Sequence, residues 1–129
     1  MLIRRVRRAQ GIRARMTHPE LSSTGYQILR FLHESGVQRS STLADTFAID
    51  KGAVSRQITH LEELGLVVRE PDPADGRAQL LRLTDDAAER LIEVDAVRRR
   101  RYDEQLATWD AARIHGLAGL LHEYNATLD

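Results

Sequence analysis

Hydrogen-bonding side chains collect on one side of the segment KGAVSRQITHLEEL, residues 51–64. At about 100° per residue its apolar residues share one helical face, and these are Val54, Ile58, Leu61 and Leu64. The outward side carries Gly52, Ser55, Arg56 and Thr59, with Gln57 at its flank. Hydroxyl, amide and guanidinium groups are the donors that contact base edges and phosphates in DNA. The segment therefore fits a DNA recognition helix, although an ordinary amphipathic helix with a solvated polar face has the same pattern.

The acidic residues of this segment restrict how it could meet DNA. Glu62 and Glu63 stand in its C-terminal half, and carboxylates repel phosphates. Recognition helices place their N-terminal residues at the base edges. We therefore expect only the N-terminal half of the segment to enter a DNA groove.

A charged turn follows the segment, in the stretch LVVREPDPADGRAQLLRLT. Its two runs rich in Val and Leu are separated by Pro, Asp and Gly, which predicts a β-hairpin. The prolines restrict the turn, and Gly76 permits its bend. Asp75 is placed to fix the loop and Arg77 to project from its tip. One arginine suffices there if it enters a narrow minor groove, where the negative potential is concentrated.

Helix caps position further elements around these two. We expect helices over residues 3–15, from Ser22 or Ser23 to about Glu34, from Ser40 or Ser41 through Phe47, from Asp50 to Gly65, from Thr84 to about Thr108, and from Asp110 to about Thr127. A short helix and a capped helix followed at once by a hairpin is the winged helix-turn-helix order. The fold class is therefore mainly α with a small β-hairpin wing, flanked by long helices. An exposed apolar stripe on those helices would need a partner, most simply a second copy of the chain.

Composition excludes several functional classes. A chain of 129 residues fits one domain, and the absence of cysteine rules out disulfides and thiol-based sensing. Equal numbers of basic and acidic residues argue weakly against nucleic-acid binding, since a basic domain is the usual electrostatic footprint. A few positioned arginines can nevertheless act locally. Since no signal peptide and no apolar run of membrane-spanning length stands out, we expect a cytoplasmic protein without a membrane partner.

Enzymatic and metal chemistry find no support in the sequence. There is no Gly-rich phosphate loop, no nucleophile elbow and no His-Glu-x-x-His spacing. His115 and His122 share one helical face, but two turns separate them, which is long for joint metal ligation. We therefore expect no catalytic residue, no metal site and no cofactor.

Residues 43–84 resemble the core of the MarR (multiple antibiotic resistance regulator) family without gaps. The matching motifs are Leu43-Ala44, Val54-Ser55-Arg56, Leu61-Glu62, Gly65-Leu66-Val67, Asp75-x-Arg77-Ala78 and Leu83-Thr84. The flanking helices match by length and order, so the resemblance covers nearly the whole chain. One departure lies in the wing, where Gly76 replaces a second basic residue that many members have.

The resemblance implies a homodimeric transcription factor that binds a pseudo-palindromic operator on double-stranded DNA. Within a single domain over residues 1–129, residues 1–20 and 100–129 would form the dimer, and residues 21–99 the winged helix-turn-helix lobe with its linking helix. The DNA-binding residues would be Ser41, Lys51, Gly52, Ser55, Arg56, Gln57, Thr59 and Arg77. Asp75 would stabilise the wing by pairing with an arginine of the lobe. The protein would be a repressor that a small-molecule effector releases, by acting in the cleft between the dimer region and the lobe.

A second hypothesis is a winged-helix dimer that binds a protein or a small ligand without specific DNA binding. The zero net charge and the acids near the proposed DNA face motivate it, namely Glu62, Glu63, Asp72 and Asp75. Binding to a partner that survives the loss of both Arg56 and Arg77 would distinguish it from the first hypothesis.

Overall fold

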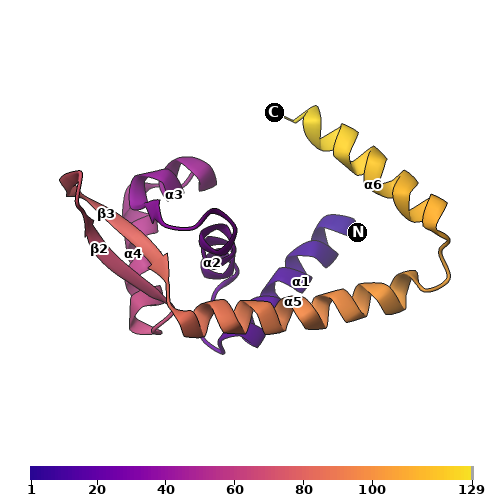
Figure 1. The fold of residues 1–129 in the computed structure, drawn as a ribbon, viewed down its shortest axis with the longest axis horizontal. Coiled ribbons are helices and arrows are strands. Elements are labelled where there is room, and N and C mark those ends of the chain that lie inside the picture. The colour runs from indigo at the N-terminus through magenta and orange to yellow at the C-terminus, as the bar shows by residue number, and fades with distance from the viewer. Residues whose placement is uncertain (129) are drawn as a thin grey trace. The chain divides into compact units, whose positions relative to one another are not determined.

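Six helices and a small antiparallel sheet make up the computed structural model of the chain, which describes residues 1–128 (Figure 1). The elements follow in the order α1 (Leu2–Thr17), α2 (Ser23–Ser35), β1 (Gln38–Arg39), α3 (Ser40–Phe47), α4 (Lys51–Glu63), β2 (Val67–Asp72), β3 (Asp75–Leu83), α5 (Asp85–Leu106) and α6 (Ala111–Ala126). The expected helices and the hairpin are confirmed, with ends shifted by a few residues. Strand β1 was not expected, since two residues carry no alternation.

The chain divides into two compact units, Met1–Val94 and Asp95–Asp129. The first unit contains α1 to α4, the sheet and the first part of α5. The second contains the remainder of α5 and α6. Helix α1 packs on α2 within the first unit. That residues 1–20 and 100–129 form a dimer, with residues 21–99 as the lobe, stays a prediction.

Side-chain caps begin most of the helices as the sequence predicts. Ser22 accepts a hydrogen bond from the Gly25 backbone N–H at 2.9 Å. Thr84 accepts one from Ala87 at 3.2 Å, and Asp110 one from Arg113 at 2.8 Å. Helix α3 differs: its N-cap residue is Arg39, which makes no side-chain cap hydrogen bond. The expectation that Ser40 or Ser41 caps this helix is therefore wrong.

The sheet has the strand order β1-β3-β2, and all of its pairs are antiparallel. The turn of the β2–β3 hairpin lies at Pro73 and Ala74, because Asp72 pairs with Asp75 across it. Gly76 is therefore inside β3 and does not make the bend. Arg77 likewise lies within the strand rather than at the tip. The register shifts between Pro71 and Asp72, and the turn lies to the N-terminal side of the expected position.

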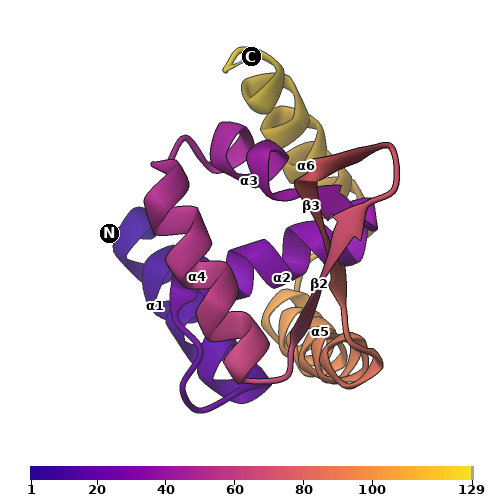
Figure 2. The same ribbon diagram turned by 90° about the vertical axis from the view of Figure 1, so that its left-hand side faces the viewer.

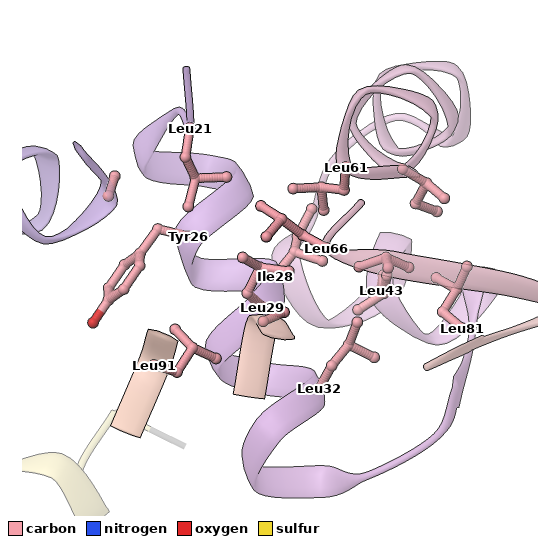
Figure 3. Close-up of a cluster of buried hydrophobic side chains, with 14 of the residues drawn as sticks. Leu21, Tyr26, Ile28, Leu29, Leu32, Leu43, Leu61, Leu66, Leu81 and Leu91 are labelled. Atoms are coloured by element: carbon pink, nitrogen blue, oxygen red, sulfur yellow. The ribbon is translucent and has the colours of Figure 1, made fainter. Parts of the chain in front are cut away.

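The core of the first unit is built by α2, α3, α4, the sheet and the first part of α5 (Figure 3). Its largest fully buried side chains include Ile28 and Leu29 of α2 and Leu61 of α4. The predicted core face of α4 is confirmed: Val54, Ile58 and Leu61 are buried, and Leu64 is half-buried against the same cluster. This packing holds α4 with its opposite side outward.

Helix α6 has no core to cover within its own unit. Its residues from Ala111 to Ala126 are all exposed, including Leu117, Leu120 and Tyr124. Within residues 1–128, no helix combines the length and the apolar character that crossing a bilayer requires.

Candidate nucleic-acid interface

The first two turns of α4 carry the predicted DNA-binding groups on the outside of the first unit. Lys51, Gly52, Ser55 and Arg56 are exposed, while Val54 anchors the same turns in the core. Figure 2 shows α4 beside the β2–β3 hairpin, with α2 and α1 behind it. Helix and hairpin thus share one side of this unit, and a rod such as DNA could meet both.

The N-terminus of α4 explains its glycine. Asp50 caps the helix by accepting a hydrogen bond from the Ala53 N–H at 3.1 Å. A Cβ atom on Gly52 would lie 2.9 Å from the accepting Oδ2 of Asp50 and 3.5 Å from Nη1 of Arg56. A residue at this position must therefore be small for the cap to keep its geometry. Gly52 therefore protects the side-chain cap of α4.

A hollow of about 250 Å³ lies where α3, the start of α4 and the hairpin meet. Its polar lining consists of Ser40, Ser41, Lys51, Ser55, Arg69 and Gln79. The structure thus brings predicted residues from two helices, Ser41 from α3 and Lys51 with Ser55 from α4, to one surface. Hydroxyls and a lysine ammonium at such a surface are donors suited to phosphate oxygens.

Two of the predicted residues already form hydrogen bonds with neighbouring residues of the protein. Gln57 is half-buried, and its Oε1 accepts a hydrogen bond from Ser22 at 3.3 Å, which directs it toward α2. The hydroxyl of Thr59 donates to the Ser55 carbonyl at 3.0 Å and accepts from Arg69 Nη2 at 3.3 Å. Their hydrogen-bonding capacity is therefore partly used by neighbours, unlike that of Ser55 and Arg56 at the front of the helix.

The acid that ties the wing to the lobe is Asp72, not Asp75 as expected. Its carboxylate pairs with Arg39 on β1 and accepts a hydrogen bond from the Ala74 N–H at 2.8 Å. The backbone hydrogen bond from Ala74 and then the Arg39 guanidinium hold the pKa of Asp72 below its usual range, although its burial acts in the opposite direction. Asp75 instead accepts a hydrogen bond from the Arg77 N–H at 3.1 Å, which orders the start of β3.

Two of the four acids that motivated a module without DNA binding, Glu62 and Asp72, are paired with arginines. Glu62 lies 2.8 Å from Arg69, and Glu70 lies 3.2 Å from Arg82. Asp72 is paired with Arg39. An acid in an ion pair repels a nearby phosphate less than a lone acid does. The acidity that motivated a module without DNA binding is therefore weaker in the folded protein than in the sequence.

Arg39, Arg69 and Asp72 hold this face together through ion pairs, a role that the sequence analysis assigned to none of them. Arg69 gave one signal: it is a charged residue inside an apolar strand run, LVVRE. Nothing in the sequence distinguished Asp72, because Glu70 and Asp75 are acids in or beside the same turn and either could equally have formed the ion pair. The pairing of Arg39 depends on strand β1, which itself was not expected.

Comparisons with known proteins agree with this geometry. Residues 20–78 match the model of the MarR family. The HTH-type transcriptional regulator YxaD from Bacillus subtilis (strain 168) is 34% identical over 106 residues, which cover 81% of this chain and 73% of YxaD. The chain belongs to the MarR family. The family and these relatives are transcription regulators, so the expectation that the protein is not an enzyme is confirmed.

Solved structures of MarR-family proteins share the fold. RV1404 from Mycobacterium tuberculosis superposes with a TM-score of 0.83 at 21% identity, covering 97% of this chain and 86% of that chain. A mutant MarR from E. coli complexed with operator DNA gives a TM-score of 0.65 at 21% identity, and the match covers 95% of this chain and 92% of that chain. The winged-helix fold class expected from the sequence is therefore confirmed.

Proposed function

We propose that this MarR-family regulator is a dimeric repressor that binds a pseudo-palindromic operator and is released by a small-molecule effector, in the cytoplasm. The observation that carries the proposal is that α4, whose first turns expose Ser55 and Arg56, lies beside the wing hairpin, which exposes Arg77. Arg56 has the length and the forked donors for a bidentate base contact. Arg77 supplies a cation for the backbone or the minor groove.

The exposed apolar residues of α6 support the dimer. A helix with Leu117, Leu120, Leu121 and Tyr124 all open to solvent is unusual in a monomer, because large apolar surfaces mark interaction sites. Helix α1 exposes Leu2, Ile3 and Val6 in its first turns. A second copy of the chain is the simplest partner, and a two-fold dimer requires a pseudo-palindromic operator with half-sites about one helical turn apart.

Release by an effector follows from the family resemblance. A ligand changes DNA binding only if it binds one arrangement of the two recognition helices better than the other. The identity of the ligand has to come from a thermal-shift screen of small molecules against the full-length protein, because a ligand of the folded state raises its unfolding temperature.

The direct test is a gel-shift titration of the full-length protein against DNA fragments selected from a genomic pool. We expect one shifted species with a pseudo-palindromic core, whose affinity falls steeply between about 50 and 200 mM salt as phosphate contacts are lost. Sedimentation of the free protein should give a dimer at the same concentrations. No selection of any fragment at the lower salt concentration would refute specific DNA binding.

A protein or ligand module gives a different pattern in the same assays. A partner bound equally well by the protein and by its Arg56→Ala, Arg77→Ala double variant would favour that function. The folded protein supports this alternative less than the sequence does, because arginines pair with some of the acids near the proposed DNA face.

A further inference from the structure

One side chain connects the wing to the recognition helix. Arg69 lies on β2, and its Nη2 is 2.8 Å from Oε2 of Glu62 near the end of α4. The same guanidinium donates to the Thr59 hydroxyl at 3.3 Å. Thr59 in turn donates to the carbonyl of Ser55 at 3.0 Å. A continuous set of polar contacts therefore runs from the wing strand to the helical turn that presents Ser55 and Arg56.

The geometry of this connection makes it more than a surface ion pair. The side chains of Arg69 and Glu62 are 28% and 34% exposed, so the pair is partly shielded from solvent. A guanidinium is a rigid planar fork, and its contacts with residues three positions apart on α4 set both a distance and a direction. A lone lysine ammonium would set only a distance.

Arg69 adds a polar contact to the other interactions that hold the wing. Val67 and Leu81 anchor its base in the core, and the Arg39–Asp72 pair holds it near the turn. Arg69 joins β2 directly to polar side chains of α4. Arg69 pairs with Leu81 in the sheet register, so it holds the base half of the hairpin. Arg77 lies farther toward the turn on β3. A change of angle at Arg69 would therefore be enlarged at Arg77.

We propose that Arg69, Glu62 and Thr59 form a clamp of positioning residues, which sets the spacing between the helix donors Ser55 and Arg56 and the wing cation Arg77. This inference rests on the proposed DNA-binding function. It assigns Thr59 to positioning through Arg69, in place of the DNA contact expected from the sequence. It also gives Glu62, an acid on a DNA-binding helix, a reason to be there.

The clamp and a simple electrostatic effect predict opposite changes in DNA affinity for the substitution Glu62→Ala. If Glu62 merely places a negative charge near phosphates, Glu62→Ala should tighten DNA binding. If Glu62 holds Arg69, the same change should weaken binding, because the angle between the wing and α4 is then less firmly fixed. Glu63, the next residue, is exposed and carries the same charge, so Glu63→Ala is the matched control.

The experiment measures the affinity of full-length variants for a fragment selected by the wild-type protein. We expect Glu62→Ala to weaken binding roughly tenfold, and Glu62→Gln to stay within about twofold because its amide oxygen still accepts from Arg69. Glu63→Ala should bind as tightly as the wild type or more tightly. Arg69→Met should weaken binding about as much as Glu62→Ala, and the double variant Arg69→Met, Glu62→Ala no more than Arg69→Met alone.

A further comparison separates positioning from a general loss of structure. In an Arg77→Ala background the wing cation is absent, so Glu62→Ala should weaken binding by less than about twofold. Thermal unfolding of each variant establishes that it is folded at the assay temperature. If Glu62→Ala is not folded at that temperature, Arg69→Met replaces it in this comparison. Unchanged or tighter binding by Glu62→Ala, or an equal loss with and without Arg77, would overturn the clamp while leaving the proposed function intact. Failure of the wild type to bind any fragment would overturn the proposed function, and the clamp with it.

Discussion

Nη2 of Arg39 lies 2.5 Å from Oδ2 of Asp72, and this ion pair joins the two edges of the small sheet. Strand β3 lies between β1, which carries Arg39, and β2, which ends at Asp72. Asp72 is buried, with 7% of its surface exposed, and it also caps the turn through the Ala74 N–H. The wing is therefore held close to its turn as well as at its base, and the acid responsible is not the one beside the wing arginine.

Asp72→Asn should weaken operator binding more than Asp75→Asn does. The first change removes the charge that holds Arg39, so the turn is free to move and the position of Arg77 is less well defined. We expect a loss of affinity of about threefold to tenfold, less than the full effect of one charge-assisted hydrogen bond, because Asp72 acts on DNA binding only through the position of the wing. Asp75→Asn keeps an oxygen that can accept from the Arg77 N–H and is the control. Gel-shift titrations of the two variants side by side make the comparison, and a larger loss for Asp75→Asn would contradict it.

The same ion pair predicts how stability depends on pH. The backbone hydrogen bond from Ala74 and the Arg39 guanidinium keep the pKa of Asp72 below its usual range in the folded protein. Its stabilisation is therefore complete above the unfolded-state pKa of about 4 and is lost as the pH falls through the lower folded pKa. The difference in unfolding free energy between the wild type and Asp72→Asn should be constant from about pH 6 to 8 and shrink below about pH 4. Urea unfolding of both proteins across this range checks it, and a difference that stays undiminished down to about pH 3 would contradict it.

Local sequence patterns predicted the helices and the hairpin of this protein well, but they predicted its long-range contacts poorly. The two faces of α4 follow from helical periodicity, because Val54 and Ile58 repeat at its spacing. Its cap follows from Asp50, because capping acts over three residues. The turn lies beside a register shift, and the Arg39–Asp72 pair depends on a two-residue strand. Neither the register shift at the turn nor the two-residue strand produces a periodic pattern in the sequence. The contact between Arg39 and Asp72 could therefore be identified only in the structure.

Arg56→Ala should reduce sequence discrimination. Arg56 is exposed on the second turn of α4, at the part of a recognition helix that meets base edges. We expect a loss of about 1–3 kcal/mol on the preferred operator and a smaller loss on fragments altered at the contacted base pair. Titrations against a set of single-base-pair variants measure this. An equal loss on every fragment would mean that Arg56 contacts phosphates instead.

Arg77→Ala should act differently from Arg56→Ala. Arg77 is the basic residue of the wing nearest the turn, next to Gly76, and it is exposed on β3. Loss of this cation should weaken binding to preferred and altered fragments alike, and lower the slope of log affinity against log salt by about 1. Arg77→Lys keeps the charge and is the matched control. A salt dependence that Arg77→Ala leaves unchanged would show that Arg77 releases no counterion.

Gly52→Ala should fail to give the stabilisation that the same change gives elsewhere in helices. Alanine normally stabilises an exposed helical position by about 1 kcal/mol relative to glycine. Here the new Cβ would lie 2.9 Å from the Asp50 oxygen that caps α4, and losing a cap costs about 1 kcal/mol. We therefore expect a net change near zero in the wild type, but a gain of about 1 kcal/mol in an Asp50→Ala background, where no cap remains to be displaced.

The control for this cycle is Gly11→Ala on α1, where a Cβ would make ordinary contacts at 3.7 Å. That change should stabilise the protein by about 1 kcal/mol in both backgrounds, because Gly11 and Asp50 share no partner. Urea unfolding of the variants gives the free energies. If Gly52→Ala stabilised the protein equally with and without Asp50, the cap would not depend on the glycine, and the reason for a glycine here would have to lie in the DNA groove alone.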